Sequence, residues 1–144
     1  MLTTLSAGGL VLMVGGLCGL LTGGMLFSVS PAVIAMQAAA AVLMVWARVT
    51  FGRRSFHPTA CPTEGRLVTG GPYAWVRHPI YTAVCLFAWA GVLAHCSVLS
   101  GALGLVVFAG AVVRMFAEER ALRLRYPGYG AYMARTRRMI PGVF

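Results

Sequence analysis

Two short polar clusters stand out in an otherwise apolar chain. Residues 77–79 read Arg-His-Pro, with Tyr81 close behind, and Glu118 and Glu119 form an adjacent pair of acids. A guanidinium binds anions, a carboxylate binds cations, and a histidine gains or loses a proton near neutral pH. These residue types therefore predict binding, and reaction, of a small charged molecule.

The elements that position these clusters are predicted to be membrane helices. The chain has 144 residues, of which 59% are hydrophobic and only 10% are charged; about a quarter are charged in an ordinary soluble domain. A span needs about 20 apolar residues. Four windows qualify: Leu5–Phe27, Pro31–Val49, Pro79–Val98 and Leu99–Ala117, each with approximate bounds. We expect an all-α integral membrane protein with four transmembrane helices in two helical hairpins.

The same windows predict one membrane domain, residues 1–144. Residues 1–50 would form the N-terminal helical hairpin. Residues 51–144 would supply a central loop, the second hairpin and a C-terminal tail. Short connections at 28–30 and 97–100 would join the helices of each hairpin.

Basic residues predict the orientation. All 12 are arginines, and they fall only within residues 48–77 and 114–138, so both hairpin tips lack them. The positive-inside rule then places both termini and the central loop in the cytoplasm, with a bacterial inner membrane as the expected location. The net charge of +9 is explained by this asymmetry and by attraction to anionic membrane lipid, so we expect no nucleic-acid partner.

The two polar clusters are predicted to meet. They lie at the start of the third window and the end of the fourth, which a hairpin places on one membrane face. Pro79 suits the first turn of a helix, and the residue before a proline avoids the helical region, so His78 is expected to be extended. The central loop and the C-terminal helix would thus form a cytoplasmic pocket for a polar, zwitterionic cofactor, which would meet a lipophilic acceptor arriving from the bilayer. No metal is expected, because the three histidines are far apart and no Cys-x-x-Cys occurs.

Small residues in the first window predict close helix packing. Gly15, Gly19 and Gly23 recur every four residues and so share one helix face. This face would pack against another span of the chain or, in a homodimer, against a second copy.

Three motifs in order give the chain a family resemblance. They are "LVTGGPYAWVRHPIY" at 67–81, "EERALRLRYPGYGAY" at 118–132 and "RRMIP" at 137–141. The chain resembles the isoprenylcysteine carboxyl methyltransferase family, which is related to the integral-membrane phospholipid methyltransferases. The resemblance covers roughly residues 51–141.

This resemblance implies a methyltransferase that uses S-adenosylmethionine, yields S-adenosylhomocysteine and has no Rossmann domain. It implies that cofactor binding falls to Gly71, Pro72, Tyr73, Arg77, His78, Tyr81, Glu118, Glu119 and Tyr132. The expected catalytic residues are Arg114, His78, Glu119 and Arg138. In this assignment an acid favours the sulfonium charge, and an arginine orients an acceptor carboxylate.

The acceptor stays open at this point. Carboxyl O-methylation of an isoprenylcysteine-like or other lipophilic carboxylate needs no strong base, whereas a lipid amine or a thiol would lose a proton first, with His78 as the base. Two other classes remain as alternatives: an NADPH-dependent membrane enzyme similar to sterol reductases, and a small four-helix transporter.

Overall fold

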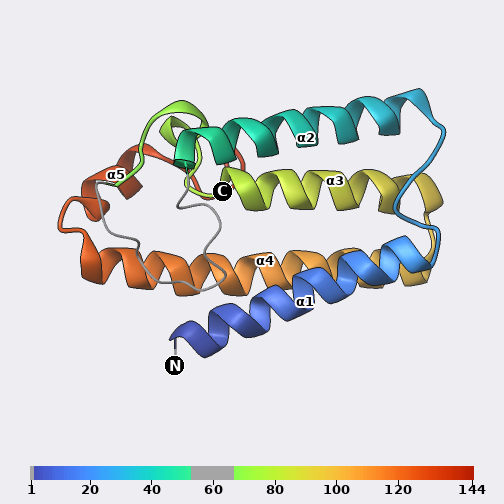
Figure 1. Ribbon diagram of the computed structural model, residues 1–144, viewed down its shortest axis with the longest axis horizontal. Helices are drawn as coiled ribbons and strands as arrows, with labels where there is room; N and C mark the ends of the chain where they lie inside the picture. The colour runs from blue at the N-terminus through green and yellow to red at the C-terminus, as the bar shows by residue number, and fades with distance from the viewer. Residues whose placement is uncertain (1, 53–66) are drawn as a thin grey trace.

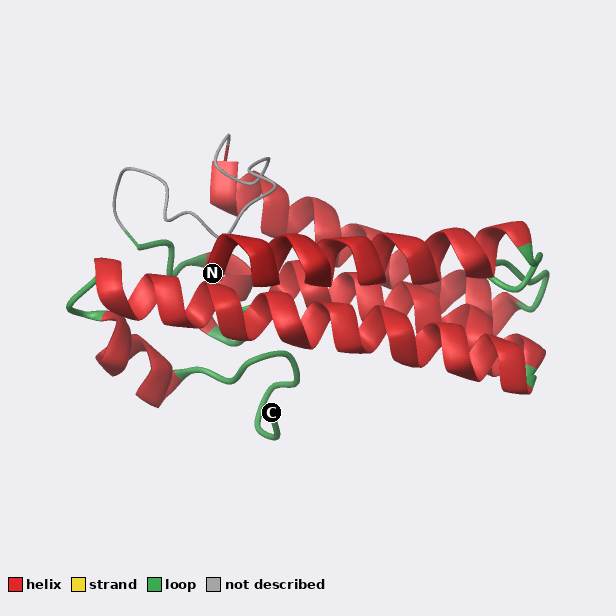
Figure 2. Cartoon of the chain, turned by 90° about the horizontal axis from the view of Figure 1, so that it is seen from below, coloured by secondary structure: helices red, strands yellow, loops and turns green. Residues whose placement is uncertain are grey.

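The computed structural model describes residues 2–52 and 67–144 of the chain, and this part is helical. Its helices are α1 (Leu2–Thr22), α2 (Pro31–Phe51), α3 (Pro79–His95), α4 (Val98–Arg125) and α5 (Tyr129–Arg135), with a 3-10 turn η2 (Gly71–Ala74). Within these ranges there is no strand, as Figure 2 shows, and only Val76 and Arg137 form an isolated parallel bridge. Most of the predicted central loop, residues 53–66, lies outside the described residues.

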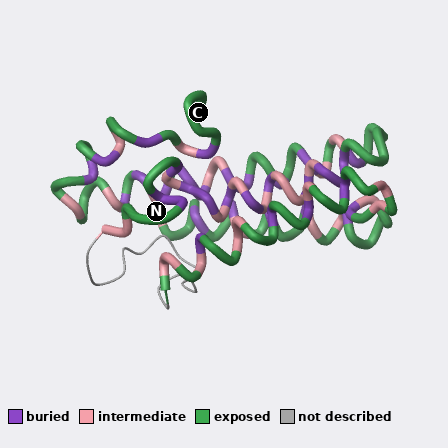
Figure 3. Tube along the Cα trace, turned by 90° about the horizontal axis from the view of Figure 1, so that it is seen from above, coloured by how far each residue is buried: buried purple, intermediate pink, exposed green. Residues whose placement is uncertain are grey.

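Three of the helices are long and apolar enough to cross a membrane: α1, α2 and α4. The protein is therefore an integral membrane protein. Helix α3 is apolar as well, but with 17 residues it is shorter than these three. Figure 3 shows that buried positions follow the inner faces of the helices while exposed positions cover the outside, as expected for a bundle surrounded by lipid.

Local sequence signals explain where the helices begin and end. Pro31 and Pro79 begin α2 and α3, where a missing N–H costs nothing. Ser97 caps α4 through a reciprocal pair of hydrogen bonds with Ser100. At its other end α4 runs to Arg125, beyond the predicted Ala117, and stops before Pro127, because the residue before a proline avoids the helical region.

The first helix ends earlier than its apolar window suggests. Thr22 is its last residue, and Gly24 follows with φ +68°, a left-handed conformation that glycine adopts without strain. Residues 23–30 therefore form the connection, which is longer than the predicted 28–30.

The first two helices, α1 and α2, pack on different partners. Helix α1 packs along α4, α2 packs along α3, and α3 packs against α4. Figure 1 shows α2 and α1 at opposite edges, with α3 and α4 between them. The predicted N-terminal hairpin is thus antiparallel in direction, but its two helices make their main contacts with the second hairpin rather than with each other.

The predicted glycine face packs on α4 only at Gly19, where an added Cβ would lie 2.8 Å from Leu103 Cδ2. A Cβ added to Gly15 would meet nothing within 4 Å. At Gly9 a Cβ would lie 2.8 Å from the carbonyl oxygen of Gly110, and at Gly16 it would lie 3.0 Å from the carbonyl oxygen of Leu103. The close α1–α4 contact thus uses Gly9 and Gly16, because these positions share a face with the buried Met13 and Leu20.

One polar side chain holds the 23–30 connection against the bundle. Gln37 is buried in α2, and its Nε2 donates to the carbonyl oxygen of Leu26 at 2.7 Å and to that of Phe87 at 3.4 Å. We expect Gln37→Leu to lower the unfolding free energy by about 1 kcal/mol, the usual size of a polar contact between membrane helices. Thermal unfolding in detergent measures this, with Thr22→Val as the control, because the exposed Thr22 hydroxyl bonds only carbonyls of its own helix. Equal melting of Gln37→Leu and wild type would contradict this role.

Candidate active site

The predicted site residues gather at one end of the bundle. Here α2 ends, α3 begins and α4 ends, and α5 with the following tail lies at the same end of the bundle (Figure 1). The hairpin of α3 and α4 brings Arg77–Tyr81 and the two acids into direct contact, as the sequence predicted.

Glu119 lies at the centre of a buried charge cluster. Its side chain is only 2% exposed, and its Oε1 accepts from Arg77 Nε at 2.9 Å. Its Oε2 accepts from Arg138 Nε at 3.3 Å. An acid this deeply buried is stable only with such partners. Glu119 therefore joins the loop before α3 to the tail after α5.

Arg77 also caps the end of α5. Its Nη1 donates to the carbonyl oxygens of Met133, at 3.1 Å, and of Thr136. The last carbonyls of a helix have no partner within the helix, and a cation there also opposes the negative end of the helix dipole. Arg77 therefore joins Glu119 of α4 to the C-terminal end of α5.

Backbone hydrogen bonds align the tail with the loop. The amides of Arg77 and His78 donate to the carbonyl oxygens of Arg137 and Arg138 at 2.7 and 2.9 Å. The Arg137 amide donates back to the Trp75 carbonyl oxygen at 3.2 Å, and Thr82 Oγ1 donates to the Met139 carbonyl oxygen at 2.9 Å. Residues 136–139, which we call the tail segment, therefore run beside residues 75–78.

A second network surrounds Glu118. The Tyr81 hydroxyl donates to Glu118 Oε1, and Arg114 donates through Nε to the same hydroxyl at 2.8 Å. Arg114 Nη2 also lies 3.3 Å from Glu118 Oε1, and Nη1 donates to the Ser6 carbonyl oxygen of α1 at 3.4 Å. The buried Arg114 thus ties α1 to the site.

His78 lies between the two acids. It is 5% exposed, its Nδ1 is 3.8 Å from Glu118 Oε2, and its Nε2 is 3.5 Å from Glu119 Oε1. Its ring stacks on that of Tyr81, with centroids 5.7 Å apart. In the described part of the chain Nε2 makes no hydrogen bond. His78 was predicted to be extended; it is non-helical, but with φ −127° and ψ 56° it is not extended, and its ring faces the acids.

The Gly-Pro-Tyr turn η2 lies at the edge of this cluster, against the end of α2. Gly71 has φ +57°, and a Cβ there would be 2.7 Å from Thr50 Oγ1. The Tyr73 ring packs against that of Phe51, with centroids 5.5 Å apart. Gly71 is thus in contact with α2 rather than with the acids. Pro72 and Tyr73, the next two residues of the same turn, are buried.

Tyr132 anchors α5 to this turn. Its hydroxyl donates to the Tyr73 carbonyl oxygen at 2.7 Å, and burial raises its pKa to about 12. The hydroxyl of the unfolded chain ionises near pH 10, so this bond contributes fully below pH 10 and is lost as the pH rises through about 12.

We expect Tyr132→Phe to lower the unfolding free energy by about 1 kcal/mol at pH 8, because the buried Tyr73 carbonyl loses its donor. Between pH 10 and 12 the loss should shrink, because the wild type itself is losing the bond there. Chemical unfolding in detergent, at pH 8 and again between pH 10 and 12, measures the difference in unfolding free energy between the variant and wild type. The exposed Arg135→Gln serves as the control, and a Tyr132→Phe protein as stable as wild type at pH 8 would contradict the assignment.

Two residues that contact the arginines of the site, Thr136 and Phe116, were not predicted from the sequence. Thr136 is 3% exposed, accepts from Arg77 and donates to the Tyr132 carbonyl oxygen at 2.8 Å. Phe116 places its ring 5.0 Å from the Arg138 guanidinium. The only signal for Thr136 was an isolated hydroxyl between Arg135 and Arg137, and such a residue is usually exposed.

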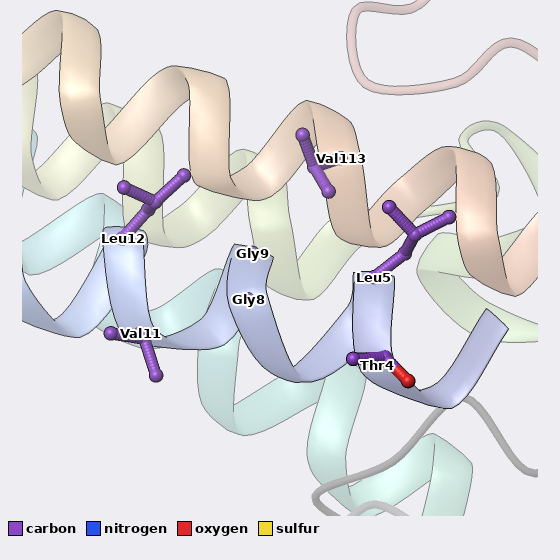
Figure 4. Close-up of a pocket in the computed structure, with 7 residues that line it drawn as sticks. All are labelled: Thr4, Leu5, Gly8, Gly9, Val11, Leu12 and Val113. Carbon is purple, nitrogen blue, oxygen red and sulfur yellow. The ribbon is translucent and has the colours of Figure 1, made fainter. Parts of the chain in front are cut away.

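An apolar groove lies elsewhere, along the seam of α1 and α4. Its volume is about 710 Å³, and it is lined by Thr4, Leu5, Gly8, Gly9, Val11, Leu12 and Val113. Figure 4 shows that Leu5 and Leu12 lie against α4 on either side of Val113. The lining has no charged side chain and opens to the outside of the bundle, so it does not suit a zwitterionic ligand.

Comparison with known proteins assigns the family. The profile of the isoprenylcysteine carboxyl methyltransferase (ICMT) family matches residues 32–124. The chain belongs to this family. No curated protein and no solved structure matches the chain.

The ICMT match covers α2, α3 and nearly all of α4, including Arg77, Arg114 and both acids. Helix α1, helix α5 and the tail segment lie outside it. Membership makes the protein a membrane methyltransferase, and the prediction of the family from three motifs is confirmed.

Proposed function

We propose that this ICMT-family protein transfers a methyl group from S-adenosylmethionine to a lipophilic acceptor. The carrying observation is the contact of His78, Tyr81 and the two acids at the end of the bundle. Membership of the ICMT family supports methyl transfer as the class of reaction. The chemistry of the side chains at the site supports S-adenosylmethionine as the cofactor.

The side chains at the site fit this cofactor by their chemistry. Glu118 is 24% exposed and offers a negative charge for a cation, while His78 Nε2 and the Tyr129 hydroxyl are buried without a hydrogen-bond partner in the described chain. Buried polar atoms are nearly always paired, so such atoms favour a site for a polar ligand. Burial also raises the pKa of Tyr129, so its hydroxyl stays protonated and available as a donor.

Carboxyl O-methylation is the reaction we favour. When bound, S-adenosylmethionine supplies a methyl group on a positively charged sulfur; the C–S bond breaks with its electron pair on sulfur as a C–O bond forms to the acceptor. A carboxylate is already ionised, so the protein need only orient it and exclude water. Arg114 and Arg138 supply guanidinium groups for this, and Arg138 remains 26% exposed. N-methylation of a lipid amine or S-methylation of a thiol would use the same side chains with His78 as the base.

The membrane arrangement is part of the proposal. Helix α3 would be the fourth span. It would be shorter than the others because Trp75 and the tail would lie at the membrane surface beside its N-terminal end. The arginines at the site end would face the cytoplasm, in a bacterial inner membrane. The cofactor would then arrive from the cytosol and the acceptor from the lipid.

Binding of labelled S-adenosylmethionine and of NADPH to the purified protein in detergent tests the function. We expect saturable binding of the first only. Saturable binding of NADPH alone would favour a reductase, and binding of neither would overturn the enzyme assignment. Incubation of membranes with methyl-labelled cofactor, followed by identification of the labelled lipid-phase product, would name the acceptor. Base-labile label indicates a methyl ester, whereas base-stable label indicates an amine or thioether.

A further inference from the structure

Arg138 lies at the exposed edge of the site, in contact with two aromatic rings. Its guanidinium carbon is 5.0 Å from the centre of the Phe116 ring and 5.4 Å from that of the Phe144 ring. A cation within about 6 Å of a ring centre, over the ring face, is attracted by the electrons of the ring. The two rings therefore help to fix the position of this guanidinium.

Phe116 reaches Arg138 from α4. It lies three residues before Glu119, and residues three apart are neighbours on a helix surface, so the ring lies beside the carboxylate that Arg138 contacts. The side chain is 49% exposed. Phe108 of the same helix is also exposed, at 39%, but contacts no cation in the described part of the chain. The contact with Arg138 thus distinguishes Phe116 from a phenylalanine that only faces lipid.

Phe144 reaches Arg138 through a tight turn at residues 140–143. Gly142 has φ +79° in this turn, and the Phe144 amide donates to the Ile140 carbonyl oxygen at 3.1 Å. The Phe144 carbonyl oxygen in turn accepts from the amides of Met139 and Ile140, at 2.7 Å each. These bonds hold the backbone of Phe144 close to the tail segment, and so its ring returns to Arg138.

The terminal nitrogens of Arg138 remain available. An arginine beside a carboxylate often binds both oxygens with parallel hydrogen bonds. Here Oε1 of Glu119 accepts from Arg77 at 2.9 Å, and Arg138 reaches only Oε2, through Nε at 3.3 Å. Neither Nη1 nor Nη2 of Arg138 makes a hydrogen bond within residues 2–52 and 67–144, and the side chain is 26% exposed. The end of the guanidinium is therefore open to a second anion.

We propose that Phe116 and Phe144 are positioning residues, which hold the Arg138 guanidinium so that its two terminal nitrogens bind the carboxylate of the lipophilic acceptor. This inference rests on the proposed function and names the groups that recognise the head of the acceptor. The face of an aromatic ring is negative and repels a carboxylate, so the acceptor approaches in the plane of the guanidinium, where two N–H groups can bind it. A protonated lipid amine would be repelled by Arg138. The arrangement therefore favours O-methylation over N-methylation.

Two probes with the same hydrocarbon tail test this inference. S-farnesylthioacetate carries a carboxylate, whereas S-farnesylcysteamine carries an amine. Isothermal titration of the protein in detergent, with detergent alone as the blank, gives the dissociation constant of each probe. We expect wild type to bind the carboxylate more tightly. Phe116→Leu and Phe144→Leu should each weaken carboxylate binding about fivefold, the effect of one cation–π contact, and leave binding of the amine and of S-adenosylhomocysteine unchanged.

Two further variants separate the aromatic contact from packing. Phe116→Trp keeps an aromatic face and should bind the carboxylate at least as tightly as wild type, because tryptophan attracts cations best. Phe108→Leu is the matched control on the same helix, and it should leave every dissociation constant unchanged.

A double-mutant cycle shows whether the rings act through Arg138. Arg138→Gln alone should weaken carboxylate binding at least about tenfold. When Arg138→Gln is already present, Phe116→Leu should have no further effect, whereas the losses of two independent residues would add.

Several outcomes would overturn the inference and leave the proposed function intact. They are additive losses in the cycle, unchanged carboxylate binding in Phe116→Leu or Phe144→Leu, and a wild type that binds the amine as tightly as the carboxylate or binds neither probe. A wild type that binds neither S-adenosylmethionine nor S-adenosylhomocysteine would instead overturn the proposed function.

Discussion

Replacing Arg77 with leucine should lower the unfolding free energy by about 3 kcal/mol and weaken cofactor binding at least about tenfold. The change leaves Glu119 buried with Arg138 as its one remaining hydrogen-bond donor, and the carbonyls of Met133 and Thr136 lose their donor. Removing one member of a buried pair costs far more than a surface pair contributes, because the other charge stays desolvated. Thermal unfolding in detergent and titration with S-adenosylmethionine measure the two losses.

Two further variants separate charge from geometry at this position. Arg77→Lys keeps the charge, but one ammonium cannot reach Glu119 and the end of α5 together, so it should restore only part of the stability. Arg135→Gln removes an arginine from an exposed position nearby and should leave both measurements near wild type. If Arg77→Leu behaved like Arg135→Gln, the cluster around Glu119 would not hold the site together.

Gly9→Leu should have the second large effect, a loss of about 3 kcal/mol. A Cβ at Gly9 would lie 2.8 Å from the Gly110 carbonyl oxygen and 2.9 Å from Arg114 Cγ. The first of these neighbours is backbone, which cannot turn away, so α1 must separate from α4. The same shift would move Ser6 away from Arg114 and so weaken the site as well.

The adjacent position gives a matched control. A Cβ at Gly8 meets nothing within 4 Å, because Gly8 lies in the open groove of Figure 4. Gly8→Leu should therefore melt at or slightly above the wild-type temperature, since leucine favours a helix more than glycine does. Thermal unfolding in detergent compares the two variants, and equal destabilisation of both would show that α1 does not pack on α4 through Gly9.

Much of the site could be predicted because the signals are local. A proline at the start of α3 and a pair of acids on α4 are visible in the sequence, and a hairpin must bring its two free ends together. The convergence of Arg77, His78, Tyr81 and the acids followed from that topology alone. The family was recognisable for the same reason, since its motifs flank the two helices.

Other features could not be predicted, because they depend on which surfaces meet. The every-fourth-residue repeat at Gly15, Gly19 and Gly23 is as regular as a packing face, but only Gly19 of the three lies against α4, and the closest backbone approach is at Gly9 and Gly16. In a chain this apolar, nearly every face of a membrane helix is hydrophobic, so hydropathy does not tell a helix face in lipid from one in contact with protein. For the same reason, hydropathy could not predict that α1 and α2 pack on the second hairpin rather than on each other.

By itself the sequence determined that the chain enters the membrane, that α2 and α3 begin at Pro31 and Pro79, and that its polar groups collect at one end. These properties depend on the composition of short segments, and any packing of the helices would preserve them. Only the tertiary structure decided how the charges pair. Glu118 and Glu119 are neighbours with identical chemistry, but one helical step of about 100° turns Glu119 toward two arginines and leaves Glu118 an open oxygen.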